Sequence, residues 1–408
     1  MPVTKSNCTG WSKKQLGEIL TLNYGWSLPE KNRVVGGAPV YGSNGIVGSH
    51  NQALVPSQGI IVGRKGSAGN VHFSREPFCP IDTTFFVAPS DTQLDIEFVY
   101  YLLLHVDLKR ILGDVGVPGL NREMAYREQT QFPNDKAEQQ KIAAVLGLVQ
   151  RAMEQQERLL RLTAELKKTL LLQLFTYGLR HDSRKQTDLG PLPQSWDAVE
   201  LGRVADVING FAFKSEDYVS SGVLNFRVVN IRDEGVIDTS SDTKFLPNEF
   251  MQTHKQYLLS EGDILLVMVG ATRGKLAFIP KSILPALMNQ NMWRIVPKSP
   301  KEMHRKYLYY FLTIAVPKFV REFSESARGF FKKSDFRSIK LPKPTFTEQQ
   351  EIADAMDNVE QKLGLHRRQH AALSGLFRTL LHELMTARIR VHDLDLGEIG
   401  CSTGIGKT

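Results

Sequence analysis

Hydrophobic residues recur every three or four positions in two long stretches of the chain. This spacing places them in one stripe along a helix, and such a stripe packs against another helix. The first stripe is Ile142, Leu146, Val149, Met153, Leu160, Leu170 and Leu174, and the second is Ile352, Met356, Val359, Leu363, His370, Leu380 and Leu384. We predict two long helices that pack on each other.

The two predicted helices also begin alike. The motif Glu-Gln-Gln-x-Ile-Ala occurs at 138–143 and again at 348–353. Just before it, Asp135 and Thr347 each offer a side-chain acceptor at the N-cap, and a glutamate or glutamine follows three residues later, as in a capping box. Gly178 is suited to end the first helix. The shared motif indicates that the chain contains a duplicated unit.

Polar residues interrupt both stripes: Gln156, Thr163 and Lys167 in the first, and His366 and His370 in the second. We interpret them as residues that fix the register and orientation of the helix pair at some cost in stability. The two histidines could bind a metal only with a third ligand, and the sequence identifies none. We therefore predict no metal site.

A globular segment precedes each helix, and these segments match as well. The pattern Trp-x4-Leu-Gly occurs at 11–17 and 196–202. Short apolar runs between turn residues predict buried strands at Gly59–Gly63, Thr84–Val87, Asp263–Gly270 and Met292–Val296, and helical periodicity occurs at 95–112 and 304–323. Each segment is therefore predicted to be α+β rather than a regular βαβ winding.

The duplication predicts the organisation of the whole chain. We expect an α+β fold with two globular α/β-type domains in a pseudo-two-fold arrangement, separated by two long antiparallel coiled-coil helices. The predicted segments are a first domain at 1–135, a first long helix at 136–179, a linker at 180–194, a second domain at 195–345, a second long helix at 346–390 and a flexible tail at 391–408.

Composition limits the kinds of protein that fit this pattern. No window approaches 18 consecutive apolar residues, and the first residues contain no apolar signal region. Cys8, Cys79 and Cys401 are far apart and odd in number, which predicts neither disulfides nor a metal site. We expect a cytoplasmic protein without membrane contact. The net charge of +8 favours a polyanionic partner such as nucleic acid.

No catalytic motif is complete. Gly404-Ile-Gly-Lys-Thr408 resembles the end of a P-loop, but the first glycine of that motif would stand at Cys401. His382-Glu383 lacks the second histidine of a zinc protease, because position 386 is threonine. The glycines of 63–69 predict a turn rather than a dinucleotide site. Methyltransferase motifs of the Asn-Pro-Pro type are absent, so we predict that the chain is not an enzyme.

Several motifs together resemble one known family, the specificity (DNA-recognition) subunits of type I restriction-modification enzymes. They are Leu189-Gly-Pro-Leu-Pro193 with Trp196, Asn209-Gly-Phe-Ala-Phe-Lys214, Ile339-Lys-Leu-Pro-Lys-Pro344, Gly37–Gly45 and Ile81–Val87. The resemblance covers nearly the whole chain. The sequence departs from the family pattern at Pro133-Asn-Asp135, which lacks a second proline, and at the opening of the first domain, which lacks Pro-x-x-Trp. These departures put in question the angle at which the first domain meets its helix.

The resemblance implies that each globular segment is a target recognition domain that reads one half of a bipartite site in double-stranded DNA. It also implies that the helices set the gap between the half-sites and dock two modification (methyltransferase) subunits. S-adenosylmethionine, ATP and magnesium would then belong to the modification subunits and the ATP-dependent restriction subunits, and this chain would bind no cofactor. The alternative is a coiled-coil assembly scaffold that does not read DNA.

Candidate DNA contacts are cationic, aromatic and small polar residues in the predicted loops, because these can meet phosphates or pair with base edges. The loop 64–70 aligns with 270–275, each just after a buried strand. For all of them a solvated turn or local packing is the alternative interpretation. The candidates are Tyr41, Ser43, Asn44, Arg64, Lys65, Ser67, Asn70, Asn121, Arg122, Lys214, Arg227, Asn230, Arg232, Thr272, Arg273, Lys275, Arg328, Lys332 and Lys333.

Overall fold

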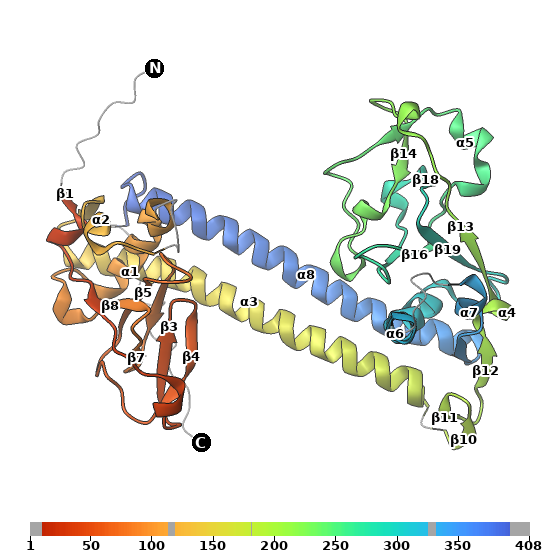
Figure 1. Ribbon diagram of the computed structural model, residues 1–408, viewed down its shortest axis with the longest axis horizontal. Helices are drawn as coiled ribbons and strands as arrows, with labels where there is room; N and C mark the ends of the chain where they lie inside the picture. The colour runs from red at the N-terminus through yellow and green to blue at the C-terminus, as the bar shows by residue number, and fades with distance from the viewer. Residues whose placement is uncertain (1–9, 113–118, 181, 325–331, 392–408) are drawn as a thin grey trace. The chain divides into compact units, whose positions relative to one another are not determined.

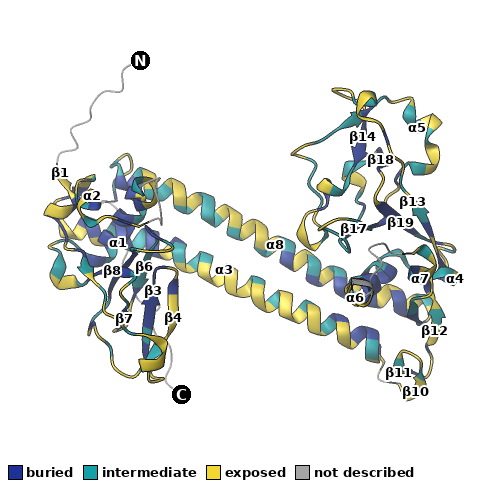
Figure 2. Ribbon diagram, viewed as in Figure 1, coloured by how far each residue is buried: buried dark blue, intermediate teal, exposed yellow. Residues whose placement is uncertain are grey.

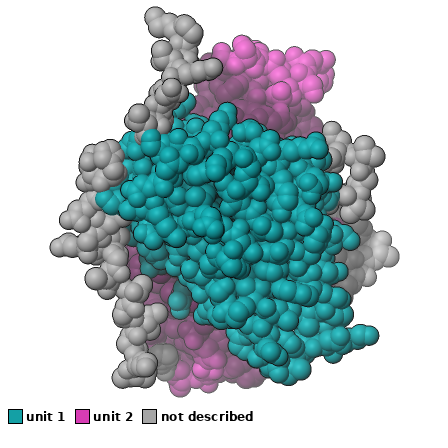
Figure 3. Space-filling model, turned by 90° about the vertical axis from the view of Figure 1, so that its left-hand side faces the viewer, with its two compact units in different colours: residues 1–158, 367–408 teal, residues 159–366 magenta. Residues whose placement is uncertain are grey.

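The computed structural model describes residues 10–112, 119–180, 182–324 and 332–391. The chain divides into two compact units, which Figure 3 shows in different colours. Unit 1 comprises residues 1–158 and 367–408, and unit 2 comprises residues 159–366. Each unit therefore contains one globular domain and part of each long helix.

The first domain contains a four-stranded and a three-stranded sheet (Figure 1). The antiparallel four-stranded sheet has the order β2 (Asn23–Tyr24), β8 (Thr84–Val87), β5 (Gly59–Gly63) and β6 (Val71–Ser74). The other sheet has the order β4 (Gly45–His50), β3 (Ala38–Gly42) and β7 (Cys79–Pro80), with β3 and β7 parallel. α1 (Ile96–Val106) packs against β5 and β6 and completes the apolar core.

The second domain repeats this topology strand by strand. Its four-stranded sheet has the order β13 (Ala205–Asn209), β19 (Met292–Pro297), β16 (Ile264–Val267) and β17 (Leu276–Phe278). Its three-stranded sheet has the order β15 (Phe245–Leu246), β14 (Val223–Phe226) and β18 (Ala286–Met288), again with one parallel pair. The equivalent of α1 is α6 (Arg305–Ser324). The duplication and the α+β fold predicted from the sequence are confirmed.

A two-stranded ribbon leads from each domain into its long helix. β1 (Trp11–Gln15) pairs with β9 (Gln129–Pro133), and β12 (Asp197–Glu200) pairs with β20 (Lys340–Lys343). Apart from 3-10 turns, the remaining short helices and strands are α2 (Arg122–Tyr126), β10 (Arg184–Thr187), β11 (Gly190–Pro193), α4 (Leu201–Val204), α5 (Phe250–Thr253) and α7 (Lys333–Arg337). The predicted linker therefore contains a hairpin, β10–β11, which buries Leu192.

In the two long helices, α3 (Lys136–Tyr177) and α8 (Phe346–Met385), the residues of the predicted stripes are buried or half-buried (Figure 2). Within unit 1, His370 Nε2 lies 3.1 Å from Glu157 Oε1, and Arg390 pairs with Glu138 at 2.7 Å. Within unit 2, Lys167 pairs with Glu360, and Arg180, just after α3, lies 3.9 Å from Glu351. Residue numbers rise along one helix while they fall along the other, so the helices are antiparallel within each unit, as predicted.

The Glu-Gln-Gln motif ties each domain to its long helix, because its first two residues are buried and the third is exposed. Gln139 donates to Pro133 O and accepts from Asp95 N, both at 2.8 Å. Gln349 donates to Pro344 O and Glu302 O, both at 3.0 Å, and accepts from His304 N at 2.9 Å. The bonded amides of Asp95 and His304 lie at the starts of α1 and α6.

The structure corrects the predicted helix ends. The N-cap of α8 is Thr345, whose hydroxyl accepts from Glu348 N at 3.3 Å, rather than Thr347, which lies in the first turn. Glu138 does not complete a capping box, because Arg390 holds its carboxylate. Gly178 ends α3 as predicted, with a φ of +66°. Val391, predicted to begin the tail, is buried in the core of unit 1, and 392–408, including the P-loop-like segment, lie outside the described residues.

Candidate nucleic-acid interface

In each domain, one short loop connects the last strand of the three-stranded sheet to the four-stranded sheet. We call residues 81–83 the first junction loop and residues 289–291 the second junction loop. Four of the backbone hydrogen bonds around the first loop have counterparts in the second domain: Gly25 N to Thr84 O, Trp26 N to Pro80 O, Ile81 N to Tyr41 O and Arg64 N to Thr83 O. The second loop has the four equivalent bonds: Gly210 N to Met292 O, Phe211 N to Met288 O, Asn289 N to Phe226 O and Met268 N to Asn291 O. The two loops therefore occupy equivalent positions in their domains and share these backbone contacts.

A glycine is required beside each junction loop. A Cβ added to Gly25 would lie 2.2 Å from Ile81 O, and one added to Gly210 would lie 1.8 Å from Asn289 O. These distances are far below van der Waals contact, so any side chain would displace the loop. The residue that follows each glycine, Trp26 or Phe211, is an exposed aromatic.

The first domain gathers cations around an exposed aromatic ring. The guanidinium carbons of Arg64 and Arg122 lie 5.2 and 5.0 Å from the ring centroid of Tyr24, which is 50% exposed. Phe85 supports the same ring at 5.0 Å. Arg64 also donates to the carbonyl of Asp82 in the first junction loop at 2.6 Å. We call Tyr24, Arg64 and Arg122 the arginine–tyrosine cluster. It combines two cations with a half-exposed aromatic ring, a combination that is common in surfaces that bind nucleic acids.

Two other predicted contacts lie next to this cluster. Lys65 is exposed and forms a β-bridge with Gly119. Asn121 caps α2, because its side chain accepts from Glu123 N at 2.9 Å, and this fixes the start of the helix that carries Arg122. Four separately predicted candidates therefore meet at one place. The sequence analysis missed Tyr24 and Trp26. The only indication of them in the sequence is that they flank Gly25, and aromatic residues next to a glycine are also common in hydrophobic cores.

The hairpin loops after β5 and β16 each contain two glycines in the left-handed region, although the second loop is one residue longer. Gly66 and Gly270 have φ near +73° and +76°, and Gly69 and Gly274 have φ of +78° and +91°. The glycine pattern is a turn, as predicted. Ser67, Asn70, Thr272, Arg273 and Lys275 all lie on these loops and are half-buried. Asn44 is exposed at the turn between β3 and β4.

Three predicted contacts are instead structural residues. Asn230 is 1% exposed, accepts from Arg227 N at 2.8 Å and donates to Asp238 O at 3.0 Å. Ser43 is buried and donates to Thr83 O at 2.6 Å. Tyr41 is buried and packs edge-on against Phe78. In the structure these three side chains make contacts within their own domains, so direct DNA contact would require them to exchange those contacts.

Several predicted cations of the second domain are neutralised by carboxylates. The ion pairs are Lys214 with Glu216 at 3.0 Å, Arg227 with Asp242 at 3.0 Å, Arg232 with Asp238 at 2.8 Å and Lys275 with Asp233 at 2.8 Å. Hydrogen bonds from Ser240, and then from Arg232, lower the pKa of Asp238, and Lys275 lowers the pKa of Asp233. At neutral pH Asp238 and Asp233 are therefore ionised. Each cation of the four pairs would have to exchange its partner for a phosphate to bind DNA.

The last candidates lie beside the start of α7. Lys332 is exposed at the N-cap of that helix, and Lys333 is half-buried in its first turn. Arg328 lies outside the described residues. Neither Lys332 nor Lys333 has an ion pair with a described carboxylate within 4.0 Å. Both are therefore available to a polyanion on the second domain.

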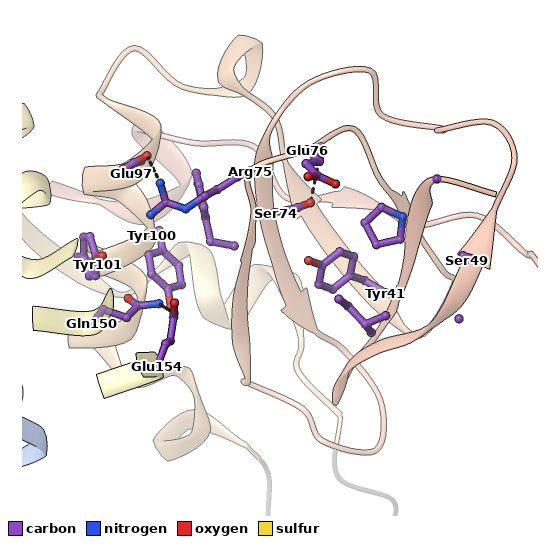
Figure 4. Close-up of a pocket in the computed structure, with 15 residues that line it drawn as sticks. Tyr41, Ser49, Ser74, Arg75, Glu76, Glu97, Tyr100, Tyr101, Gln150 and Glu154 are labelled. Atoms are coloured by element: carbon purple, nitrogen blue, oxygen red, sulfur yellow. Dashed lines mark hydrogen bonds and ion pairs between the residues drawn. The ribbon is translucent and has the colours of Figure 1, made fainter. Parts of the chain in front are cut away.

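A cavity of about 500 Å³ lies in unit 1 between β3, β6, α1 and α3 (Figure 4). Its lining includes Glu76, Glu154 and the ion pair of Arg75 with Glu97, whose atoms lie 3.7 Å apart. Burial raises the pKa of Tyr100 in its wall. Because the carboxylates outnumber the cations, this cavity does not suit a nucleic acid, and Tyr41 is the one DNA candidate that lines it.

Comparison with known proteins identifies the family. The family model described as the type I restriction modification DNA specificity domain matches residues 9–164 and 193–374, once for each half of the chain. The chain belongs to this family. This chain is similar to the specificity subunit of the type I restriction enzyme MjaVIII from Methanocaldococcus jannaschii. The two sequences are 25% identical over 312 residues, which cover 74% of this chain and 72% of the relative. The specificity subunit of EcoAI from Escherichia coli is 36% identical over 104 residues, which cover 25% of this chain and 17% of that protein.

Solved structures support the same fold. The S subunit of a type I restriction-modification system from M. genitalium has a TM-score of 0.69 and 17% identity, and the match covers 94% of this specificity subunit and 98% of that chain. Among the described residues, no helix is long and apolar enough to cross a membrane. Nor do the described His, Cys, Asp and Glu residues form a group of three or more that could hold a metal ion.

Proposed function

We propose that this chain selects the DNA site of a type I restriction-modification complex, with each domain reading one half of a bipartite site. The observation that carries the proposal is the repeated junction loop, which holds exposed side chains at equivalent places in two domains. Two copies of one reading device suit a site of two halves. The arginine–tyrosine cluster supplies phosphate contacts in the first domain. The long antiparallel helices then set the unread gap.

The exchange of residues 1–135 for the matching segment of another family member tests this proposal. We expect one half of the selected site to change and the other half to stay the same, because the first junction loop and the arginine–tyrosine cluster both lie in the exchanged segment. The measurement is selection of bound fragments from a random duplex pool. Changes in both halves would contradict independent reading, and the absence of any selected sequence would favour a scaffold that does not read DNA.

Catalysis is assigned to the partner subunits in this proposal. Two modification subunits would supply adenine methylation with S-adenosylmethionine, and the restriction subunits would use ATP and magnesium. We infer that a modification subunit docks on α3 within unit 2, because Leu159, Leu162 and Leu166 are 40%, 51% and 55% exposed there. Their spacing places them on one face of the helix, beside the buried stripe. Exposed leucines in a row suit a partner helix.

Glutamine at Leu159, Leu162 and Leu166 should prevent assembly with the modification subunits. Each leucine that loses its burial in the interface forfeits about 1.5 kcal/mol, so the affinity should fall more than about a hundredfold. The measurement is complex formation by analytical ultracentrifugation. The control carries glutamine at Leu54 and Leu189, which are exposed to a similar extent outside the long helices. Unchanged assembly of the triple variant would exclude this face as the docking surface.

A further inference from the structure

We infer that Gln290 and Asn291, the two exposed amides of the second junction loop, read bases in the second half-site and select adenine. This inference rests on the proposed function and names the residues that would carry it out in the second domain. Both side chains are exposed, and neither has a hydrogen-bond or ion-pair partner among the described residues. They are therefore available to a ligand.

The loop beneath these amides is rigid. Asn289 is 8% exposed, donates to Asn225 Oδ1 at 3.1 Å and accepts from Gln290 N at 2.6 Å. Met268 N donates to Asn291 O at 3.0 Å, which ties the loop to the end of β16. The close approach of Gly210 to Asn289 O leaves the loop no room to move inward. Side chains on such a fixed backbone are held in place before a ligand binds, which readout of base edges requires.

The backbone at Asn291 has a φ of +70°, in the left-handed region. Asparagine tolerates this region better than most residues, but glycine would adopt it with less strain. A residue other than glycine in a backbone conformation that glycine adopts with less strain points to a use for its side chain. A primary amide can donate to N7 or accept from N6 of adenine, and with both groups it forms the bidentate pair typical of Asn and Gln in the major groove.

The first domain carries different chemistry at the same positions. The equivalents of Gln290 and Asn291 are Asp82 and Thr83, as the shared backbone hydrogen bonds show. The carbonyl of Asp82 accepts from the Arg64 guanidinium, whereas the residue equivalent to Arg64 in the second domain is Met268. The scaffold is thus shared and the exposed side chains differ, as expected when the two halves of the site have different sequences.

Two variants test the inference in the full chain assembled with its modification subunits. Gln290→Glu keeps the size of the side chain but replaces its donor with an acceptor, so it should lower binding to the selected site by about tenfold to a hundredfold and favour cytosine, whose N4 donates, at one position. Asn291→Gly keeps the left-handed backbone and removes the side chain, so it should lose selection at one position of the second half-site. Selection from a random duplex pool measures both effects.

The unchanged first half-site is the internal control, and Gln252→Glu gives the same charge change at another exposed glutamine of the second domain. If the wild-type complex selects a site and both junction-loop variants keep its base preferences, this inference is wrong while the proposed function stands. If the variants alter the first half-site or only lower affinity for all sequences alike, the residues do not read bases. A wild-type complex that selects no site would overturn both the proposed function and this inference.

Discussion

Glutamine at both Arg64 and Arg122 is expected to lower the affinity for duplex DNA roughly a hundredfold, because each charge-assisted phosphate contact contributes about 1.5 kcal/mol. The plot of log affinity against log salt should also lose a slope of about two, since two fewer counterions are released. Arg64 has no carboxylate partner among the described residues, and Arg122 lies 3.7 Å from Glu123. Fluorescence anisotropy over a range of salt concentrations measures both quantities.

Arg75→Gln is the matched control, since Arg75 is an exposed arginine of the same domain that pairs with Glu97 and lines the acidic cavity. It should leave the salt dependence unchanged. A variant with lysine at both 64 and 122 tests whether the positive charge alone is sufficient. It should keep the slope of log affinity against log salt, because both charges remain. It should bind DNA more weakly than the wild type, because lysine lacks the planar guanidinium group that contacts Tyr24. An unchanged slope in the double glutamine variant would show that the arginine–tyrosine cluster does not face DNA.

Gln349→Ala is expected to lower the free energy of unfolding of unit 2 by about 3 kcal/mol. The reason is the loss of three buried hydrogen bonds, to His304 N, Glu302 O and Pro344 O, each worth about 1 kcal/mol. Gln350→Ala removes the same side chain one residue later in the same motif, at an exposed position, and should change stability by less than about 0.5 kcal/mol.

Hydrogen exchange resolves where this loss occurs. In the Gln349 variant the amides at the start of α6 and α8 should lose protection, because Gln349 joins these two segments, while unit 1 should exchange as before. Equal stability of the two variants would mean that the motif does not tie the domain to the helix. The equivalent variants at Gln139 and Gln140 should show the same contrast in unit 1.

The helix motif illustrates the limit of sequence reasoning. The spacing of the Glu-Gln-Gln motif predicted helix starts, and both helices begin next to it. Glu138 and Gln350 were predicted to complete capping boxes, yet Glu138 pairs with Arg390, and Glu348, for which no partner was predicted, accepts from Trp196 Nε1 at 3.0 Å. These partners are distant in sequence and become neighbours only after folding, so no local pattern indicates them.

The candidate DNA contacts fall into two groups, those that meet at the surface and those that are buried within a domain. Residue type and loop position were enough to select Arg64, Lys65, Asn121 and Arg122, which the structure brings together. The same criteria also selected Asn230 and Ser43, which are buried and bonded to the backbone. Polarity in a loop does not distinguish a side chain that stabilises the loop from one that faces solvent.

By itself the sequence determined the duplication, the antiparallel helix pair and the main strands and helices, because these depend on periodicity and on repeated local motifs. The tertiary structure alone decided which loop residues meet. Tyr24, Arg64 and Arg122 come from a strand, a hairpin loop and a helix, and Gln290 becomes recognisable only through the hydrogen bonds that align it with Asp82. The physical reason is that a binding surface is made by contacts between distant segments, whereas sequence periodicity reports only the side of a single segment that is buried.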